Sequence, residues 1–446
     1  MELSSRLGYG IRLYDDSDLL LTPSRKCVSA KGAVVALIQA LPWEPPCRDM
    51  ELTGSTESSG GTPETGKVEP ILLQRTGVGG LANQHGHREA FTMSILKASP
   101  LVEALQTYSA PLEGRRGLLR LDFNENTVGP SPLVVAAVRA MAPEHYGMYP
   151  EYDKLKHRYA QALGVAKEHV GLFNGADGAI HAVFQAFGAV GETLLMATPT
   201  FGYYAPCACQ QGMTIRTVPY GLPGFHYPRQ AVAQALQSRP RLLMICNPNN
   251  PTGTRMDPDW IRAMAAAHAN TLVVVDELYE AFTGDTVLPL ALQQPNLLVL
   301  RSLSKTAGLA ALRLGFAVGS PGIVERLERV TGPYDVNGFA VTAAFAALDD
   351  PGHVRSYVQE VGAARDWLLP RLAAAGLRHH CDGGNYLLLW PDQDLDSLVA
   401  ALRRRGVLVR PMTGKPLVDG SVRVSIGSCA QMKLFWERYQ QCATVA

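Results

Sequence analysis

The chain has almost no net charge: 41 Lys and Arg side chains are balanced by 40 Asp and Glu, which leaves a formal charge of +1 over 446 residues. A protein that binds nucleic acid or an anionic membrane by general attraction carries a clear positive excess. Long apolar runs are also absent, because runs such as the one near 271–275 are far too short to cross a bilayer. We therefore predict no nucleic-acid partner and no membrane partner, although a local charged patch is compatible with this composition.

Paired cysteine motifs are absent as well. No Cys-x-x-Cys pair occurs, and of the eight cysteines only Cys207 and Cys209 lie close together. A structural zinc site normally needs two such pairs, so we expect no metal. Scattered thiols in a chain of this length are typical of a reducing compartment. The first 20 residues contain four acidic side chains and no signal-peptide pattern, so we predict a cytoplasmic location.

The first 92 residues differ in composition from the rest. In 51–66, twelve of sixteen residues are Gly, Ser, Thr or Pro, and Leu52 is the only large apolar side chain. Such a segment cannot bury enough apolar surface to offset the entropy lost on ordering. We expect 1–92 to be an N-terminal extension that is largely disordered, and the 354 residues from Met93 onward to form the folded protein.

Helical and strand-like patterns alternate from about residue 133. Short apolar and β-branched runs, typical of buried strands, lie at 169–175, 192–200, 214–220, 241–248, 271–279, 296–304 and 312–319. Helical spacing is found at 133–141, 152–163, 178–190 and 259–270. This alternation predicts a three-layer α/β domain with a mostly parallel central sheet. After residue 335, a helix-rich stretch and runs at 385–390, 407–412 and 421–428 predict a smaller α+β domain.

Side chains that can bind an anion follow the strand predicted at 296–304. Lys305 comes directly after this strand, close to Ser302 and Ser304, and Arg313 lies eight residues further on. A lysine at a strand end is by itself most often a solvated surface residue. Here the hydroxyls and the arginine around it can each bind an anion.

Other strand ends carry further polar groups. Asp276 ends an apolar run and Tyr279 follows three residues later, while Asn250 precedes a Pro-Thr-Gly turn. Each has an ordinary explanation, since an acid can cap a helix and an amide can form a turn. At 175–177, a strand leads into a helix whose first N–H groups can cradle a phosphate, and Asp177 is expected to cap that helix. Ligands of parallel sheets collect at such strand ends.

In this order, the motifs resemble those of a known family, the fold-type I, pyridoxal-phosphate-dependent aminotransferases of class I/II. The resemblance rests on Ser-Leu-Ser-Lys at 302–305 with Arg313, on Asn-Pro-Asn-Asn-Pro-Thr-Gly at 247–253, and on Val-Asp-Glu-Leu-Tyr at 275–279. The spacings between the motifs match too, and the resemblance extends over roughly 94–440. It implies the fold of that family and pyridoxal 5'-phosphate as cofactor.

The resemblance also implies a role for each residue. Lys305 would form the Schiff base with the cofactor and transfer the substrate's proton, and Asp276 would pair with the pyridine nitrogen. Phe201 would stack on the ring, where some relatives have tyrosine. The remaining residues would hold the ring's 3-oxygen, namely Asn250 and Tyr279, or the cofactor phosphate, namely Ser302, Ser304, Arg313 and the backbone of Ala176 and Asp177.

Two arginines point to the substrate. Arg423 lies in a strand-like run of the small domain; a surface ion pair would explain it, but the family uses an arginine here for the substrate's α-carboxylate. The arginine that matches Arg410 helps to bind the substrate's phosphate in the histidinol-phosphate aminotransferases. A second basic group is what a phosphorylated substrate requires, because the cofactor's phosphate already occupies the first anion site.

Three further segments resemble the histidinol-phosphate aminotransferases: RLDFNENTVGPSP at 120–132, MYPEYD at 148–153 and GPYDVNGFA at 332–340. In that subfamily, the tyrosine that matches Tyr149 reaches the cofactor phosphate of the partner subunit, which implies a homodimer. Asn337 matches the asparagine of the Pro-Tyr-x-x-Asn segment, which we assign to substrate binding. Related enzymes that act on aromatic amino acids share most of these positions.

The sequence thus predicts an aminotransferase that interconverts histidinol phosphate and imidazole acetol phosphate, with 2-oxoglutarate and glutamate as the other pair. Alternatives are an aromatic amino-acid aminotransferase, a phosphoamino-acid decarboxylase of the same fold, and a cofactor-binding regulator that uses the extension. Beyond the extension, the expected organisation is a segment at 93–148 that packs on the small domain, a large cofactor-binding domain at 149–335 and a small domain at 336–446.

Overall fold

The computed structural model describes residues 10–13, 19–22, 96–106 and 111–443. The chain divides into two compact units, 1–91 and 92–446. The described residues of the first unit form two antiparallel strands, β1 (Gly10–Leu13) and β2 (Leu19–Thr22). The rest of the extension predicted at 1–92 lies outside the described residues, so its disorder stays a prediction.

The second unit contains a seven-stranded sheet in the order β4-β10-β9-β8-β7-β5-β6. Only β10 runs antiparallel to its neighbours; every other neighbouring pair is parallel. The strands are β4 (Val170–Asn174), β5 (Thr193–Thr198), β6 (Thr214–Pro219), β7 (Leu242–Cys246), β8 (Leu272–Asp276), β9 (Leu297–Ser302) and β10 (Leu314–Gly319). Each lies inside a run that the sequence predicted as a strand, and the mostly parallel α/β sheet is confirmed.

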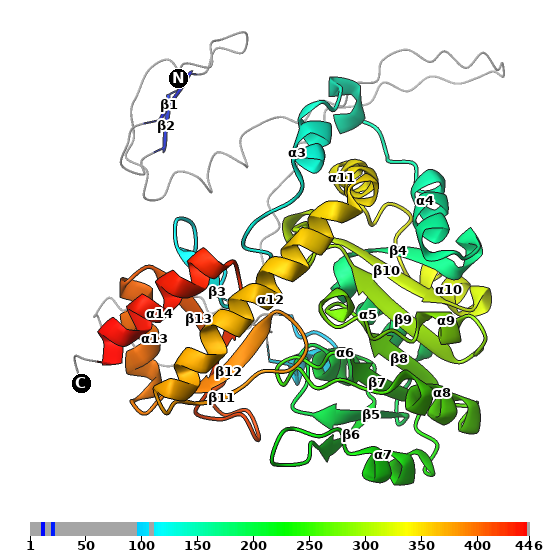
Figure 1. Cartoon of the computed structure of the whole chain (residues 1–446). Coiled ribbons are helices and arrows are strands. Elements are labelled where there is room, and N and C mark those ends of the chain that lie inside the picture. The colour runs from blue at the N-terminus through cyan, green and yellow to red at the C-terminus, as the bar shows by residue number, and fades with distance from the viewer. Residues whose placement is uncertain (1–9, 14–18, 23–95, 107–110, 444–446) are drawn as a thin grey trace, which may run out of the picture. The chain divides into compact units, whose positions relative to one another are not determined.

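Helices cover both faces of this sheet, because successive side chains of its strands point to opposite faces. On β8, Val273 and Val275 pack into one core cluster and Val274 into another, and all three are fully buried. The first cluster is covered by α4 (Asp153–Leu163), α7 (Arg229–Leu236), α8 (Pro258–Ala267), α9 (Leu288–Ala291) and α11 (Gly338–Asp349). The second is covered by α5 (Gly175–Phe187), α6 (Tyr204–Gln210) and α10 (Pro321–Glu328). The three-layer prediction is confirmed (Figure 1).

A second, five-stranded sheet has the order β11-β12-β14-β13-β3. Its strands are β3 (Leu119–Leu121), β11 (Arg378–His380), β12 (Tyr386–Trp390), β13 (Val407–Pro411) and β14 (Val422–Ser425). Only β3 runs parallel to its neighbour, β13. Apolar side chains of α12 (Pro351–Ala374), α13 (Leu395–Arg404) and α14 (Cys429–Ala443) pack with those of this sheet in one core cluster.

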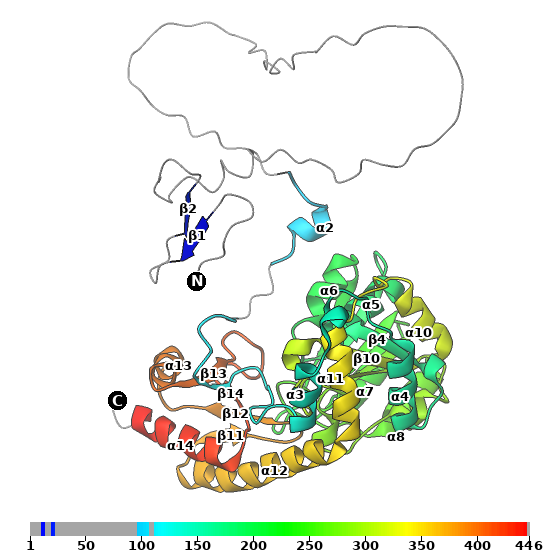
Figure 2. The ribbon, with the colours of Figure 1, turned by 90° about the horizontal axis from the view of Figure 1, so that it is seen from above.

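The segment before residue 149 contacts both lobes. Its strand β3 joins the small sheet, and its helix α3 (Pro132–Arg139) packs on α11; the short helix α2 (Pro100–Glu103) precedes both. Although α11 lies in the range assigned to the small domain, its Ala340 and Ala344 belong to the core of the large sheet. The next helix, α12, runs from α11 to the small sheet (Figures 1 and 2), where it contacts α14 and β11. We therefore place the passage between the two lobes in α12.

Local sequence determines where several helices begin. Ser131, Asp257 and Asp350 each precede a proline at the start of a helix, and each side chain accepts a hydrogen bond from a backbone N–H of the first turn. A proline fits there because the missing N–H has no partner inside the helix. Across the part of the chain that the structure describes, no helix has both the length and the apolar composition of a membrane span.

Candidate active site

A cavity of about 590 Å³ lies at the carboxyl ends of the parallel strands and is also lined by residues of the small sheet. Parallel sheets place their ligands at this edge. The cavity brings together all the predicted site residues except Tyr149 and Asn337. They are Ala176, Asp177, Phe201, Asn250, Asp276, Tyr279, Ser302, Ser304, Lys305, Arg313, Arg410 and Arg423.

Lys305 follows β9 and lines the cavity. Its Nζ donates a hydrogen bond of 2.9 Å to the carbonyl oxygen of Phe123. Burial, together with the positive charge of Arg423, lowers the pKa of Lys305 from its ordinary value of 10.5 to about 8. An appreciable fraction of the amine is then neutral near pH 7, as a nucleophile or a base requires.

Asp276 is the last residue of β8 and is only 2% exposed. The hydroxyl of Tyr204 donates to its Oδ2 at 2.6 Å, and the backbone N–H of Leu278 donates to its Oδ1 at 3.3 Å. Burial raises the pKa of Asp276 to about 6, while these two hydrogen bonds oppose the rise. The carboxyl group is therefore held in a fixed orientation, and a cationic partner in the cavity would stabilise its charged form.

The N-terminus of α5 forms a cradle with Arg313 and two serines. Gly175 begins this helix with a φ of 71°, and a Cβ there would lie 2.4 Å from Nη2 of Arg313. Only glycine permits this close approach. Arg313 donates from Nη2 to Oδ2 of Asp177 at 2.7 Å, and Ser302 donates to Oγ of Ser304 at 2.9 Å. Free N–H groups at a helix start, hydroxyls and a guanidinium together suit an anion of phosphate size.

Asn250 and Tyr279 present polar groups to the same cavity as Phe201. Oδ1 of Asn250 accepts a hydrogen bond of 2.6 Å from Nη1 of Arg423. Tyr279 is 4% exposed, and burial raises the pKa of its phenol above the usual range, so the hydroxyl keeps its proton. An aromatic side chain and two hydrogen-bonding groups can accommodate a flat, polar ring.

The small sheet adds a cationic wall. Arg410 on β13 lies directly opposite Arg423 on β14 in the register of the two antiparallel strands. Like charges in this position destabilise a sheet unless something compensates them. Lys415, in the loop after β13, lines the cavity as well. Among the described residues, neither Arg410 nor Lys415 forms an ion pair with an acidic side chain. This wall therefore favours a bound anion.

Two predicted site residues lie elsewhere. Asn337 is the N-cap of α11: its Oδ1 accepts from the N–H of Ala340 at 2.9 Å, and its Nδ2 donates to the carbonyl of Leu312 at 3.0 Å. Tyr149 is 71% exposed and stacks on Tyr334, with ring centroids 3.8 Å apart. The single chain thus brings neither side chain into its own cavity.

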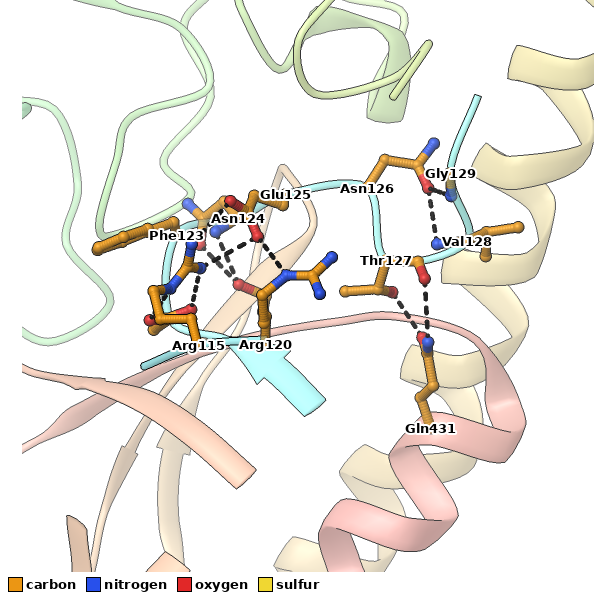
Figure 3. Close-up of polar contacts among 12 residues, drawn as sticks. Arg115, Arg120, Phe123, Asn124, Glu125, Asn126, Thr127, Val128, Gly129 and Gln431 are labelled. Carbon is orange, nitrogen blue, oxygen red and sulfur yellow. Dashed lines mark hydrogen bonds and ion pairs between the residues drawn. The ribbon is translucent and has the colours of Figure 1, made fainter. Parts of the chain in front are cut away.

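Other residues of the site were missed from the sequence: Phe123, Asn124, Tyr204 and Lys415. Two of them belong to a segment that lies against the small sheet (Figure 3). In it, Arg115 donates to both Asp122 and Glu125, and its guanidinium lies 4.1 Å from the ring centroid of Phe123. The signature at 120–132 pointed to the segment, but not to the contacts that its residues make.

No group of His, Cys, Asp or Glu side chains that could hold a metal ion occurs within the described ranges. The six cysteines of these ranges form no disulfide bonds. Functional groups of the cavity are instead amines, guanidiniums, hydroxyls, the amide of Asn250 and the carboxyl groups of Glu125, Asp177 and Asp276.

Comparison with known proteins gives consistent matches. The family model of aminotransferase class I and II matches residues 116–438. A histidinol-phosphate aminotransferase 1 of Nitrosococcus oceani is 34% identical over 323 residues, which are 70% of this chain and 86% of that protein. A histidinol-phosphate aminotransferase of Symbiobacterium thermophilum is 35% identical over 330 residues, which are 73% of this chain and 90% of that protein.

A solved structure shares the fold: histidinol-phosphate aminotransferase from Sinorhizobium meliloti in complex with pyridoxal-5'-phosphate. It superimposes with a TM-score of 0.72 at 23% sequence identity, covering 80% of this chain and 100% of that one. The family model and the curated relatives therefore agree with the fold, and the range matched by the family model contains every predicted site residue.

Proposed function

We propose that this chain, which belongs to the class I and II aminotransferases, transfers the amino group of histidinol phosphate to 2-oxoglutarate. Imidazole acetol phosphate and glutamate would be the products. The observation that carries the choice of substrate is the opposed pair Arg410 and Arg423, a second anion site in the same cavity as the phosphate cradle of α5.

The enzyme depends on pyridoxal 5'-phosphate, and the residues of the cavity fit this cofactor. Gly175 leaves room where a Cβ would meet Arg313, so the start of α5 and the guanidinium can converge on one phosphate. Asp276 can hold the pyridine nitrogen, Phe201 can cover the ring, and the 3-oxygen can be held by Asn250 and Tyr279. When bound, the cofactor supplies an electron sink for the negative charge left as the substrate loses its α-proton.

Two residues then act on protons at stated atoms. Nζ of Lys305, with its pKa lowered to about 8, can hold the cofactor and would afterwards move the substrate's proton from Cα to C4′ of the cofactor. The carboxyl group of Asp276, fixed by Tyr204, would keep the ring nitrogen protonated. Because Asp276 is buried, its interaction with the ring nitrogen would be stronger than it is in water.

Lys415 adds a third cation to the wall formed by the two arginines, and the guanidinium of Arg410 lies 5.8 Å from the ring centroid of Phe123. A phosphate dianion and an imidazole match this combination of charge and aromatic surface. An aromatic amino-acid aminotransferase is the second candidate, because Leu112, Phe123 and Met412 give the cavity apolar surface. A decarboxylase would use the same cofactor site but release carbon dioxide.

We further propose a homodimer in which Tyr149 enters the cavity of the partner subunit. In support, several aromatic and apolar side chains near Tyr149 are exposed in the single chain. They are Tyr146 and Met148, which are close to it in sequence, and Tyr334, on which its ring stacks. Such side chains are typical of a surface that a second copy covers. The cytoplasmic location and the division into lobes at 149–335 and 336–446 stay proposals.

The test is a donor profile of the pure protein loaded with cofactor. Histidinol phosphate, tyrosine, phenylalanine and L-threonine O-3-phosphate, a phosphoamino acid that has a carboxyl group, are each supplied with 2-oxoglutarate, and glutamate and carbon dioxide are both measured. Glutamate formed fastest from histidinol phosphate supports the proposal. A preference for tyrosine or phenylalanine selects the aromatic enzyme, and carbon dioxide without glutamate selects the decarboxylase.

A further inference from the structure

We propose that Asn124 is a positioning residue that makes the hydroxyl of Tyr279 a hydrogen-bond donor toward the cofactor, and that Ser425 fixes its orientation. The proposal rests on the assignment of Tyr279 to the cofactor's 3-oxygen, and it is independent of which amine the enzyme accepts. Neither the contact between Asn124 and Tyr279 nor the one between Ser425 and Asn124 was predicted from the sequence.

Asn124 lies at the meeting point of the segment before α3 and the strand β14. It is fully buried, and its φ of 53° places it in the left-handed region, which asparagine tolerates better than most residues. Its side-chain Nδ2 donates to Oη of Tyr279 at 3.0 Å. Figure 3 shows how its side chain lies in the segment that follows β3.

Three more hydrogen bonds fix this residue. The backbone N–H of Asn124 donates to Oγ of Ser425 at 2.9 Å, and the hydroxyl of Ser425 donates back to Oδ1 of Asn124 at 3.1 Å. The backbone carbonyl of Asn124 accepts from Nδ2 of Asn385 at 3.3 Å. Because Ser425 uses its one proton on Oδ1, the amide presents its N–H side, and not its oxygen, to Tyr279.

Counting donors gives the consequence for Tyr279. A phenol has one proton and can also accept hydrogen bonds. Since Asn124 donates to Oη, the proton of Tyr279 stays available for another acceptor. Tyr279 lines the cavity, and its ring is held edge-on against Tyr386 at a centroid distance of 5.0 Å, so the cavity is where that acceptor would lie.

The surroundings of Tyr279 favour the same state on balance, although the charge of Arg423 and the hydrogen bond from Asn124 lower its pKa. The groups that act on it are Arg423, Asp276 and Cys246, besides Asn124 itself. Burial, which is the largest influence, raises the pKa of the phenol above its usual range. Tyr279 therefore stays neutral and keeps the proton that it would donate.

The test exploits the fact that aspartate has the shape of asparagine, tolerates the same backbone conformation and cannot donate from its carboxylate. In Asn124→Asp, the carboxylate would accept the proton of Tyr279 and withdraw it from the cofactor. A hydrogen-bond donor to the 3-oxygen stabilises the deprotonated form of the nitrogen that links Lys305 to the cofactor. Loss of this donor therefore raises the pH midpoint, which is the pH at which half of these nitrogens are protonated. The midpoint is followed by the visible absorbance of the bound cofactor, without any substrate.

We call the hydrogen-bond chain from Asn124 through Tyr279 to the cofactor the relay. Four proteins distinguish it from a simple effect of charge: wild type, N124D, Y279F and N124D/Y279F. We expect N124D to raise the midpoint by about one pH unit, a tenfold change in proton affinity, and by clearly less in the Y279F background. An equal shift in both backgrounds means that the new charge acts through space, and this overturns the relay. An unchanged midpoint in N124D or in Y279F also overturns it.

Two further variants keep the test decisive. Ser425→Ala removes the hydroxyl that orients the amide of Asn124 without adding a charge. It should raise the midpoint in the presence of Tyr279 but not in Y279F. No shift in S425A contradicts the proposal even if N124D fails to fold. Thr127→Val is the matched control, since Thr127 binds Gln431 from the same segment. T127V should leave the midpoint unchanged. A shift like that of N124D would mean that Asn124 only holds this segment in place, which contradicts the proposal.

Discussion

Arg410 and Arg423 lie directly opposite each other on neighbouring antiparallel strands, and both line the cavity that holds Lys305. Arg423 is held from two sides, because it donates to Oδ1 of Asn250 at 2.6 Å and to the carbonyl of Asp122 at 2.7 Å. Arg410 has no such hydrogen bond among the described residues, so it is the arginine that is available for a second anion.

Replacing Arg410 by Met should therefore weaken the binding of the phosphorylated amino donor specifically. A hydrogen bond to a charged group contributes about 1.5–3 kcal/mol, so we expect KM for histidinol phosphate to rise roughly 10- to 100-fold, with a smaller change in KM for 2-oxoglutarate. Steady-state kinetics with each substrate varied in turn measures this. Arg404→Met, an exposed arginine at the end of α13, is the control and should change neither KM.

The same substitution has a consequence without any substrate. Because it removes one of two like charges that face each other on adjacent strands, R410M should be no less stable than wild type and up to about 1 kcal/mol more stable. Urea unfolding of the cofactor-free protein measures the free energy of unfolding. A clear loss of stability would contradict the view that Arg410 is retained for binding.

Gly175→Ala should impair cofactor binding. The added Cβ would lie 2.4 Å from Nη2 of Arg313, so the guanidinium or the start of α5 must move away from the phosphate. We expect the cofactor's Kd to rise at least about tenfold, measured by equilibrium titration of the cofactor-free protein. Gly191→Ala is a matched control, since Gly191 also has a positive φ, of 82°, but open space around it. Equal losses in both variants would show that backbone strain alone is responsible.

Tyr204→Phe should destabilise the protein and loosen Asp276. The variant removes the 2.6 Å hydrogen bond to Oδ2 of a buried carboxyl group, which costs about 1–3 kcal/mol of unfolding free energy. It should also raise the pKa of Asp276 further, because that bond opposes the effect of burial. Tyr203→Phe is the control, since the Tyr203 hydroxyl interacts with Cys207. A loss of unfolding free energy that is no greater in Y204F than in Y203F would contradict the view that the Tyr204 hydroxyl stabilises Asp276.

The lowered pKa of Lys305 predicts a pH dependence of stability in the cofactor-free protein. Below pH 8 the amine is protonated in both the folded and the unfolded state, so the folded state bears the full cost of burying the charge. Between about pH 8 and 10.5 only the unfolded chain keeps the proton, so folding becomes more favourable as the pH rises.

This prediction is measured against Lys305→Met, which has no group to titrate there. Across that window the stability of wild type relative to K305M should increase by roughly 3 kcal/mol at most, since each pKa unit corresponds to about 1.4 kcal/mol. Urea unfolding of both proteins at several pH values provides the difference. A difference that stays flat with pH would show that the Lys305 pKa is not lowered in the folded state.

Mixing two inactive variants tests the proposed homodimer. In K305A the cavity lacks its amine, and in Y149A the partner's cavity lacks its tyrosine. If Tyr149 acts across the interface, a mixed dimer has one site with both residues intact, and unfolding and refolding an equal mixture should restore about a quarter of the wild-type sites. Activity equal to the sum of the separate variants would place Tyr149 in its own subunit's site, or in none.

The sequence predicted the large sheet and most of the site because the signals were local. The seven strands are apolar runs that end at breakers, and Asp276 and Lys305 are read directly from the ends of two of them. Helix α11 lies in the range predicted for the small domain, but its Ala340 packs in the core of the large sheet. The sequence does not show this packing, because the partners of Ala340 are far away in the sequence.

The residues that were missed depend on contacts between distant segments. Asn124 meets Ser425 across 301 positions, and Tyr204 meets Asp276 across 72. No pattern within either segment marks such a pair, because an asparagine in a loop and a tyrosine in a helix have many ordinary uses. Tyr149 is the reverse case, because the sequence pointed to it but the single chain does not show its proposed role. That role lies in the cavity of a second copy of the chain.

The central claim is that the cavity selects an amine that carries its own phosphate. The most direct measurement is the ratio of kcat/KM for histidinol phosphate to that for histidinol, the same amine without the phosphate, in wild type and in R410M. The account predicts a ratio of about 100 or more in wild type and a fall of roughly tenfold or more in R410M. A wild-type ratio near one, or a ratio that R410M leaves unchanged, would contradict it.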